Sequence, residues 1–292
     1  MFVISTRNFP PDIGGMQNLM GGLANALTNH GPVKTFADKS ENFEEYDKLS
    51  KVDIERFGGI KLFRKYRKAN RLVEFIQENK NIRSMFFDHW KSLEKINLEV
   101  LKNIPTFCLI HSKEINHPKG SMLNKRVLNS IQKTKYIIAN SNFTKNLGVQ
   151  IGLPEDKIHI IHPGCNSPIK IQQKFQNQAE KLFMDSFPKI ITVARLDKRK
   201  NHQNILLCLR NLKEKFPKIR YISVGDGEEK NNLQKLTKEL KIEKEVSFLY
   251  KVEENLKFSL LKNSNLFLMP AIQYKKSVEG FGISFVEAAS YG

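Results

Sequence analysis

The feature that most constrains the fold is an alternation of short apolar runs with longer amphipathic stretches, repeated along the whole chain. The apolar runs cover residues 2–6, 33–37, 83–87, 106–111, 136–139 and 158–162, then 190–194, 220–224, 246–250 and 266–269. They are short and mostly rich in β-branched or aromatic residues, as expected of strands buried on both faces. Strands that alternate with helices predict parallel sheets joined by right-handed crossovers.

The amphipathic stretches between these runs predict helices, for example over 16–29 and 123–134, and 202–216, 229–240 and 254–263 in the second half. A Gln/Lys-rich segment at 166–189 shows no strand pattern, and we place a domain boundary there, near residue 170. The predicted fold class is α/β. It has an N-terminal Rossmann-like domain over 1–170 and a C-terminal one over 171–292, and a cleft between such domains is a usual place for a ligand.

Charge and cysteine usage exclude some classes of protein. The formal net charge is +18, divided evenly as 25 − 16 = +9 over residues 1–165 and 23 − 14 = +9 over 166–292. This even excess favours an anionic partner but not a localised nucleic-acid stripe.

The three cysteines lie far apart, which argues against a disulfide framework or a zinc site. The first residues, MFVISTR, do not resemble a secretory signal, and no apolar run is long enough to span a bilayer, so we expect a cytoplasmic protein.

The segment EGFGISFVEAASYG at 279–292 follows a predicted strand, at the edge of a parallel sheet where ligands bind. Gly280 and Gly282 allow close approach of a bound group, and 283–289 has a helical pattern whose N-terminus favours an anion. Glu279 precedes this helix, whereas Glu287 lies inside it. Carboxylates accept hydrogen bonds from sugar and ribose hydroxyls, so the two residues are candidates for different parts of one ligand.

A second basic segment, ITVARLDKRKNH at 191–202, follows another predicted strand. Arg195 and Lys200 are candidates for stabilising a diphosphate leaving group, whereas Lys198 and Arg199 are expected to be solvated. The chain contains no Asp-x-Asp pair, the usual Mg²⁺ ligand of nucleotide-sugar enzymes. We therefore expect cationic side chains, not a metal, to stabilise the leaving group.

Taken in order, RLDKRKNH, VGDGEEKNNLQKL and EGFGISFVEA resemble glycosyltransferase family four, a retaining family with the GT-B fold. The N-terminal RNFPPDIGGMQNLMGGLANAL resembles that family's opening strand, loop and helix, so the resemblance covers nearly the whole chain. It implies two Rossmann-like domains whose parallel sheets face each other across a cleft. Family members usually continue beyond the helix that carries Glu287, so we expect the second domain to be incomplete here.

The resemblance also implies residue roles. Arg195 and Lys200 match the pair that grips the donor diphosphate. Glu279 matches a glutamate near the donor sugar and Glu287 one at the nucleotide ribose. Four further residues complete the implied site. Phe281 and Gly282 would offer backbone N–H groups to the sugar or phosphate, Gly14 and Gly15 match a glycine loop that closes on the donor, and His111 matches a histidine lining the reaction centre.

The implied activity is transfer of a sugar from a nucleotide-diphosphate donor to a glycan or lipid-linked acceptor, with retention and with neither metal nor cofactor. This is typical of cell-surface polysaccharide biosynthesis. The basic, aromatic stretch at 61–76 is a candidate for docking on an anionic membrane, although its basic residues do not share one helical face. Two alternatives stay open: a GT-B nucleotide-sugar epimerase, and a non-catalytic basic protein that binds membranes or nucleic acid. We expect no nucleic-acid partner under the leading interpretation.

Overall fold

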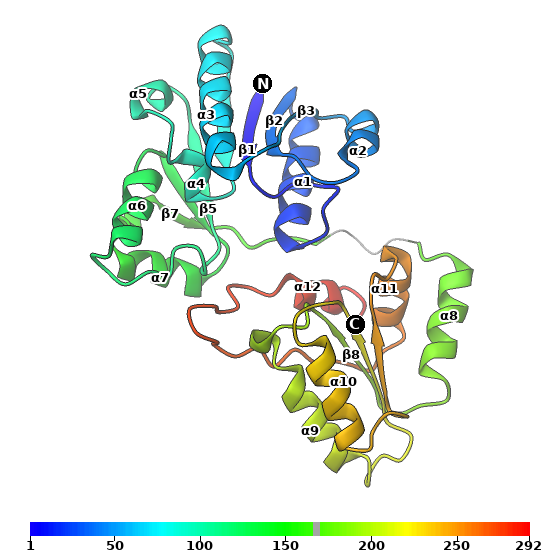
Figure 1. The fold of residues 1–292 in the computed structure, drawn as a ribbon. Helices are drawn as coiled ribbons and strands as arrows, with labels where there is room; N and C mark the ends of the chain where they lie inside the picture. The colour runs from blue at the N-terminus through cyan, green and yellow to red at the C-terminus, as the bar shows by residue number, and fades with distance from the viewer. Residues whose placement is uncertain (166–169) are drawn as a thin grey trace. The chain divides into compact units, whose positions relative to one another are not determined.

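A computed structural model describes residues 1–165 and 170–292 of the chain. It divides into two compact units, Met1–Pro163 (unit 1) and Gly164–Gly292 (unit 2). Each unit has one parallel β-sheet with helices on both faces (Figure 1). This is the α/β architecture that the alternation of apolar runs predicts.

Unit 1 contains a seven-stranded sheet in the order β3-β2-β1-β4-β5-β6-β7, and every strand pair is parallel. The strands are β1 (Phe2–Thr6), β2 (Val33–Asp38), β3 (Asp53–Phe57), β4 (Ser84–Phe87), β5 (Thr106–Ile110), β6 (Tyr136–Ala139) and β7 (Ile158–Ile160). The chain winds outward from β1 to β3 and then returns to place β4 on the other side of β1. The pair β1/β4 is therefore the topological switch point, outside which such sheets bind ligands.

The helices of unit 1 cover the two faces of its sheet. They are α1 (Gly15–Thr28), α2 (Phe43–Leu49), α3 (Lys61–Glu78), α4 (Trp90–Leu93), α5 (Leu98–Leu101), α6 (Met122–Ile131) and α7 (Asn142–Ile151), with a 3₁₀ turn η1 (Glu155–Lys157). Neighbouring residues of β1 serve opposite faces, since Ile4 packs in the cluster that contains Met20 of α1 and Val3 in the one that contains Leu72 of α3.

Unit 2 has a four-stranded parallel sheet in the order β10-β9-β8-β11. Its elements are β8 (Lys189–Val193), β9 (Arg220–Val224), β10 (Val246–Leu249) and β11 (Leu266–Phe267), with helices α8 (Gln173–Phe183), α9 (His202–Leu212), α10 (Lys230–Glu239), α11 (Glu254–Lys262) and α12 (Ile283–Ala289) and a 3₁₀ turn η2 (Lys198–Lys200). Ile190 packs with α9 and α10, and Ile191 packs with α8 and α11 on the opposite face (Figure 1).

Two elements differ from the sequence-based expectation. Strand β3 has the sequence DIERF, and its charged residues interrupt any apolar run, so the sequence pattern did not predict it. Such a sequence can form a strand here because β3 lies at the sheet edge, where no apolar run is needed. The segment 166–189, interpreted as a connection, includes residues 166–169, which lie outside the described residues, but it also contains α8. Phe175, Ala179 and Phe183 of α8 are buried at a spacing of four residues, so this helix belongs to the core of unit 2.

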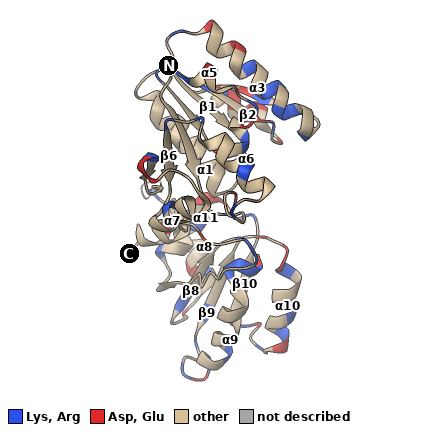
Figure 2. Ribbon diagram, turned by 90° about the vertical axis from the view of Figure 1, so that its left-hand side faces the viewer, with Lys and Arg blue, Asp and Glu red and all other residues tan. Residues whose placement is uncertain are grey.

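The described residues contain no helix both long enough and apolar enough to cross a membrane. Lys and Arg residues occur on many elements of both units, including α3 (Figure 2). The basic stretch at 61–76 is indeed helical, as α3.

Candidate functional site

In unit 2, the predicted residues Lys200 and Glu279 are in direct contact. The Lys200 Nζ lies 2.5 Å from Glu279 Oε2, and the Arg199 guanidinium donates to the same oxygen. Lys200 Nζ also donates a hydrogen bond to Met269 Sδ at 3.1 Å. Both cations donate to Oε2, and Glu279 Oε1 has no hydrogen-bond partner among the described residues. Oε1 can therefore accept a hydrogen bond from a ligand.

The loop after β8 is built to hold these cations. The Asp197 carboxylate accepts from the backbone N–H of Lys200 at 3.0 Å and so closes the 3₁₀ turn η2. The loop 225–227 lies directly against it. A Cβ on Gly225 would fall 2.0 Å from the carbonyl oxygen of Ala194, and one on Gly227 would fall 2.4 Å from that of Leu196. The two glycines are thus needed for the close packing of loop 225–227 against the backbone of the loop after β8.

The structure contradicts the expectation for Arg199, and the Arg195 side chain does not take part in the contact between Lys200 and Glu279. Arg199 was expected to be solvated, but only 18% of its side chain is exposed because it is paired with Glu279. Sequence reasoning missed it, since its partner lies 80 residues away. Arg195 is exposed, and within the described part of the chain its side chain forms no hydrogen bond or ion pair. It remains available for an anionic ligand at the same sheet edge.

Glu287 lies apart from Glu279, on α12. Its Oε1 is 2.9 Å from Lys257 Nζ of α11, and the two side chains are only 15% and 16% exposed. Gly282 is the residue before α12 and has φ of 86°, a conformation that favours glycine. Phe281 precedes it in the loop after Glu279. The predicted difference in placement of the two carboxylates, one in a loop and one in a helix, is therefore present.

The remaining predicted residues lie in unit 1, at the carboxyl edge of its sheet. His111 directly follows β5. Its backbone N–H donates to Glu114 Oε1 at 2.6 Å, and its ring Nε2 is buried without a hydrogen-bond partner in the described residues. Ser112, next along, has φ of 95°, an outlier that is typical of functional turns. Gly14 and Gly15 form the start of α1, and Gly14 adopts an extended conformation.

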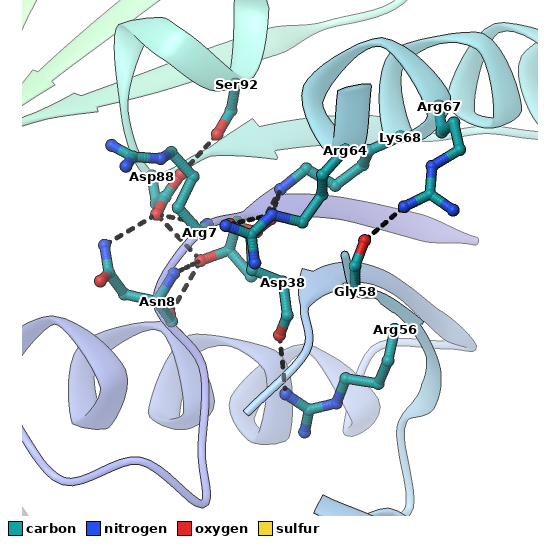
Figure 3. Close-up of polar contacts among 11 residues, drawn as sticks. Arg7, Asn8, Asp38, Arg56, Gly58, Arg64, Arg67, Lys68, Asp88 and Ser92 are labelled. Carbon is teal, nitrogen blue, oxygen red and sulfur yellow. Dashed lines mark hydrogen bonds and ion pairs between the residues drawn. The ribbon is translucent and has the colours of Figure 1, made fainter. Parts of the chain in front are cut away.

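Asp88, which sequence reasoning did not single out, organises the switch point between β1 and β4. It is fully buried, and its Oδ2 accepts from the Thr6 hydroxyl at 3.0 Å and from the Arg7 backbone N–H at 2.8 Å. Its Oδ1 accepts from the Ser92 hydroxyl at 2.8 Å (Figure 3). These bonds tie the end of β1 to the start of α4. No local sequence signal marks Asp88, because its partners at β1 are about 80 residues away.

A second buried polar pair lies next to Asp88. Lys68 of α3 is only 5% exposed, and its Nζ donates to Asp38 Oδ1 and to the Thr6 carbonyl, both at 2.7 Å. Arg64 approaches the other oxygen of Asp38 at 3.5 Å (Figure 3). Lys68 therefore anchors α3 to the sheet. It is not part of the exposed basic surface that the sequence of α3 presents.

His89, at the N-terminus of α4, lies in the same region. Burial, with the charges of Arg7 and Lys91, lowers the pKa of His89 from 6.5 to about 2. Its neutral ring accepts a hydrogen bond from the Lys91 backbone N–H at 3.0 Å. Among the described residues, no cluster of three or more His, Cys, Asp or Glu side chains is arranged to hold a metal ion.

Two family models match the chain in sequence. The model described as Glycosyltransferase Family 4 matches residues 13–167, and the one described as Glycosyl transferases group 1 matches residues 173–292. An uncharacterized glycosyltransferase of Methanocaldococcus jannaschii is 33% identical over 125 residues, which are 41% of this chain but 29% of that protein. A second uncharacterized glycosyltransferase of the same organism is 21% identical over 307 residues, covering 98% of this chain and 77% of that protein.

Among solved structures, Anabaena HepE in complex with UDP-glucose superimposes with a TM-score of 0.77. The two are 17% identical, and the match covers 100% of this chain and 78% of that one. At this identity the likeness is one of fold. The predicted fold class, α/β of the GT-B type with two parallel sheets, is confirmed.

Proposed function

The chain belongs to glycosyltransferase family 4, and from this premise we propose that it transfers a sugar from a nucleotide-diphosphate donor to an acceptor. The observation that carries the proposal is the contact of Glu279 with Lys200 at the carboxyl edge of the sheet in unit 2. This contact places a carboxylate, which can accept hydrogen bonds from hydroxyl groups, beside a cation that can bind a diphosphate. A donor with a sugar at one end and phosphates beside it needs both.

In this proposal Arg195 and Lys200 bind the diphosphate, and the free Oε1 of Glu279 accepts from a sugar hydroxyl. Lys200 has a third N–H beyond its bonds to Glu279 and Met269, which it can give to a phosphate oxygen. Arg199 keeps Glu279 oriented while Lys200 takes up the new partner. Positioning and charge stabilisation then carry the reaction.

The other predicted residues complete the proposed site. Glu287 binds the nucleotide ribose through Oε2, since Lys257 occupies Oε1. Phe281 and Gly282 supply backbone N–H groups to the sugar or phosphate. Gly14, Gly15 and His111 act from unit 1, the glycines toward the donor and His111 toward the reacting sugar. The ring Nε2 of His111 is buried and has no hydrogen-bond partner in the part of the chain that the structure describes, which supports this role, because such an atom needs a partner that a substrate can supply.

We propose that transfer proceeds with retention and without a metal ion. Retention follows from the family resemblance. Metal independence is supported by the absence of an Asp-x-Asp pair from the sequence and by the cations of the loop after β8, which can take the role of Mg²⁺ at the leaving group. The solved complex of HepE supports UDP-glucose as the first donor to test.

We further propose a lipid-linked acceptor of cell-surface glycan synthesis, met at an anionic membrane through the start of α3. Ile60, Leu62 and Phe63 are 70%, 57% and 60% exposed there, among Lys and Arg side chains. Exposed apolar groups beside cations are typical of membrane-surface contacts. Replacing Phe63 by Ser and Arg67 by Gln should reduce binding to vesicles of phosphatidylglycerol.

The membrane test has a matched control in the last two residues of α2, Lys48 and Leu49. Lys48→Gln with Leu49→Ser removes the same kinds of group at another exposed position, since Leu49 is 81% exposed. It should leave vesicle binding unchanged. Equal loss in both double variants, or equal binding to neutral phosphatidylcholine, would leave α3 without a membrane role.

The proposed activity is tested by thermal unfolding with a panel of nucleotide-sugars, because a ligand that binds the native state raises its apparent stability. A hit is then followed by a transfer assay with product identification. Release of nucleotide with a new glycosidic bond supports transfer, whereas an epimerised donor sugar would favour the epimerase alternative. If no nucleotide-sugar stabilises the protein, the non-catalytic alternative becomes the better account.

A further inference from the structure

Unit 1 contains a cavity of about 330 Å³ that the donor site does not use. Its walls come from the end of β1 (Ser5, Arg7), the start of α3, and α4 with Lys91 and Ser92. It therefore opens at the β1/β4 switch point, where parallel α/β sheets bind ligands. We call it the basic cavity, because eight of its lining residues are Lys or Arg and two are acidic, an excess of 8 − 2 = 6 positive charges.

Both acidic residues of the basic cavity are already paired. Asp38 lies 2.7 Å from Lys68 and 3.5 Å from Arg64. Glu94 lies 2.6 Å from Arg126 and 3.8 Å from Lys65. The four other cations of the wall have no carboxylate within ion-pair distance in the described ranges of the chain: Arg7, Lys61, Lys91 and Lys95.

The cations of the wall repel one another. Burial, together with the charges of Arg7 and Arg126, lowers the pKa of Lys91. Lys68 and Arg64 are fixed by Asp38, so the wall cannot relax by turning these side chains away (Figure 3). An anion of high charge bound among them would remove this repulsion, and the rigid part of the wall lowers the cost of ordering the site.

We propose that the basic cavity binds the phosphate group of a phosphate-bearing acceptor. The identification of the ligand as the acceptor rests on the proposed function, whereas the binding of a phosphate group does not. A phosphate ester fits better than a carboxylate, because it offers more oxygens and up to two charges to several point-like ammonium groups. The volume of about 330 Å³ admits more than the phosphate alone.

Trp90 makes the proposal measurable, because it is the single tryptophan of the chain and its ring is contacted by two cations of the wall. Lys91 Nζ lies 5.3 Å and the Arg126 guanidinium 5.4 Å from the ring centre. Titration of the full chain with inorganic phosphate at constant ionic strength should give a saturable change in Trp90 fluorescence and a matching heat by calorimetry.

The test variant replaces Lys91 and Lys95 by Gln, and the control replaces Lys51 and Lys80, two exposed lysines outside the cavity, in the same way. The test variant should weaken phosphate binding at least about tenfold and the control less than about twofold, since only the first pair touches the anion. No heat with the wild type, or equal affinity of the two variants, would overturn the proposal.

Two further arms identify the source of the phosphate and keep the two proposals apart. Competition by glucose 6-phosphate indicates a small sugar phosphate, whereas competition only by phosphatidylcholine vesicles containing phosphatidic acid indicates a lipid headgroup; both support the site. Arg195→Ala with Lys200→Ala should keep phosphate binding in unit 1. If the wild-type chain binds phosphate but no nucleotide-sugar, the proposed function is wrong and the basic cavity remains an anion site.

Discussion

Lys200 and Glu279 lie 79 residues apart in sequence, yet the ammonium of one is 2.5 Å from the carboxylate of the other. The contact joins the loop after β8 to the loop before α12, at the same edge of one sheet. Lys200 is 8% exposed, so its charge is held mainly by this partner. The pair is the centre of the proposed donor site.

The two glutamates should separate in function. Glu279→Ala is expected to slow transfer by about a hundredfold with little loss of nucleotide binding, because its group acts at the sugar. Glu287→Ala should weaken nucleotide binding by about tenfold or more through loss of a charge-assisted hydrogen bond. Calorimetry with the nucleotide and a transfer assay measure the two effects. If both variants bind and transfer like the wild type, the assignment of the site is wrong.

Lys68→Gln should destabilise unit 1 by about 2–4 kcal/mol, since it leaves Asp38 and the Thr6 carbonyl without their buried cation. Urea unfolding followed by the fluorescence of Trp90 reports this change, because Trp90 lies in unit 1. Lys80→Gln, at an exposed position just after α3, is the control and should alter the free energy of unfolding by less than about 0.5 kcal/mol. Equal stability of the two variants would contradict a structural role for Lys68.

Gly225→Ala should disrupt the loop that carries Arg195, because the new methyl group would lie 2.0 Å from the Ala194 carbonyl oxygen. We expect loss of donor binding together with lower thermal stability of unit 2. Gly22→Ala is the contrast, since its added Cβ would meet no other described residue within 4 Å outside the backbone of its own helix. It should be neutral or stabilise by about 0.5–1 kcal/mol. A tolerated Gly225→Ala would show that the close backbone approach is not required.

The stability of unit 1 should fall as the pH drops below about 6.5. The folded state lowers the pKa of His89 to about 2, whereas in the unfolded chain His89 takes a proton near its ordinary value of 6.5. Protons therefore favour the unfolded state between these values. The contribution of His89 is complete above pH 6.5 and decreases at lower pH, by up to about 2 kcal/mol at pH 5.

His89→Asn keeps a side-chain acceptor for the start of α4 and removes the titration, so it should flatten the pH dependence of urea unfolding read from Trp90. His30→Asn, at an exposed position of the same unit, should retain the wild-type slope. An unchanged slope in His89→Asn would mean that other groups cause the pH dependence.

Much of the fold follows from the sequence, because buried parallel strands need apolar residues on both faces. β1, β6 and β9 agree with their predicted limits for that reason. The edge strand β3 was missed, since Asp53 and Glu55 interrupt any apolar run. The helix α8 was missed because Gln and Lys dominate its exposed faces, although Phe175 and Phe183 define the buried one.

The site was predictable only where a motif stays local. Glu279 and Lys200 stand in recognisable segments, but the pairing of Arg199 with Glu279 and of Lys68 with Asp38 depends on packing between distant elements. A lysine in a basic run looks solvent-exposed in sequence. Lys68 is buried because the turn of α3 directs it at the ends of β1 and β2, which no composition or spacing rule encodes.

The most direct test of the account is calorimetric titration of the chain with the donor found by screening, UDP-glucose first, in the presence of a chelator. We predict saturable binding that chelation leaves unchanged and that Arg195→Ala with Lys200→Ala weakens by about a hundredfold, the loss of two charge-assisted contacts. Lys198→Ala, which removes an exposed cation of the same loop, should retain the wild-type affinity. Binding that requires a divalent metal, or equal affinity of the double variant and the wild type, would contradict the proposed donor site.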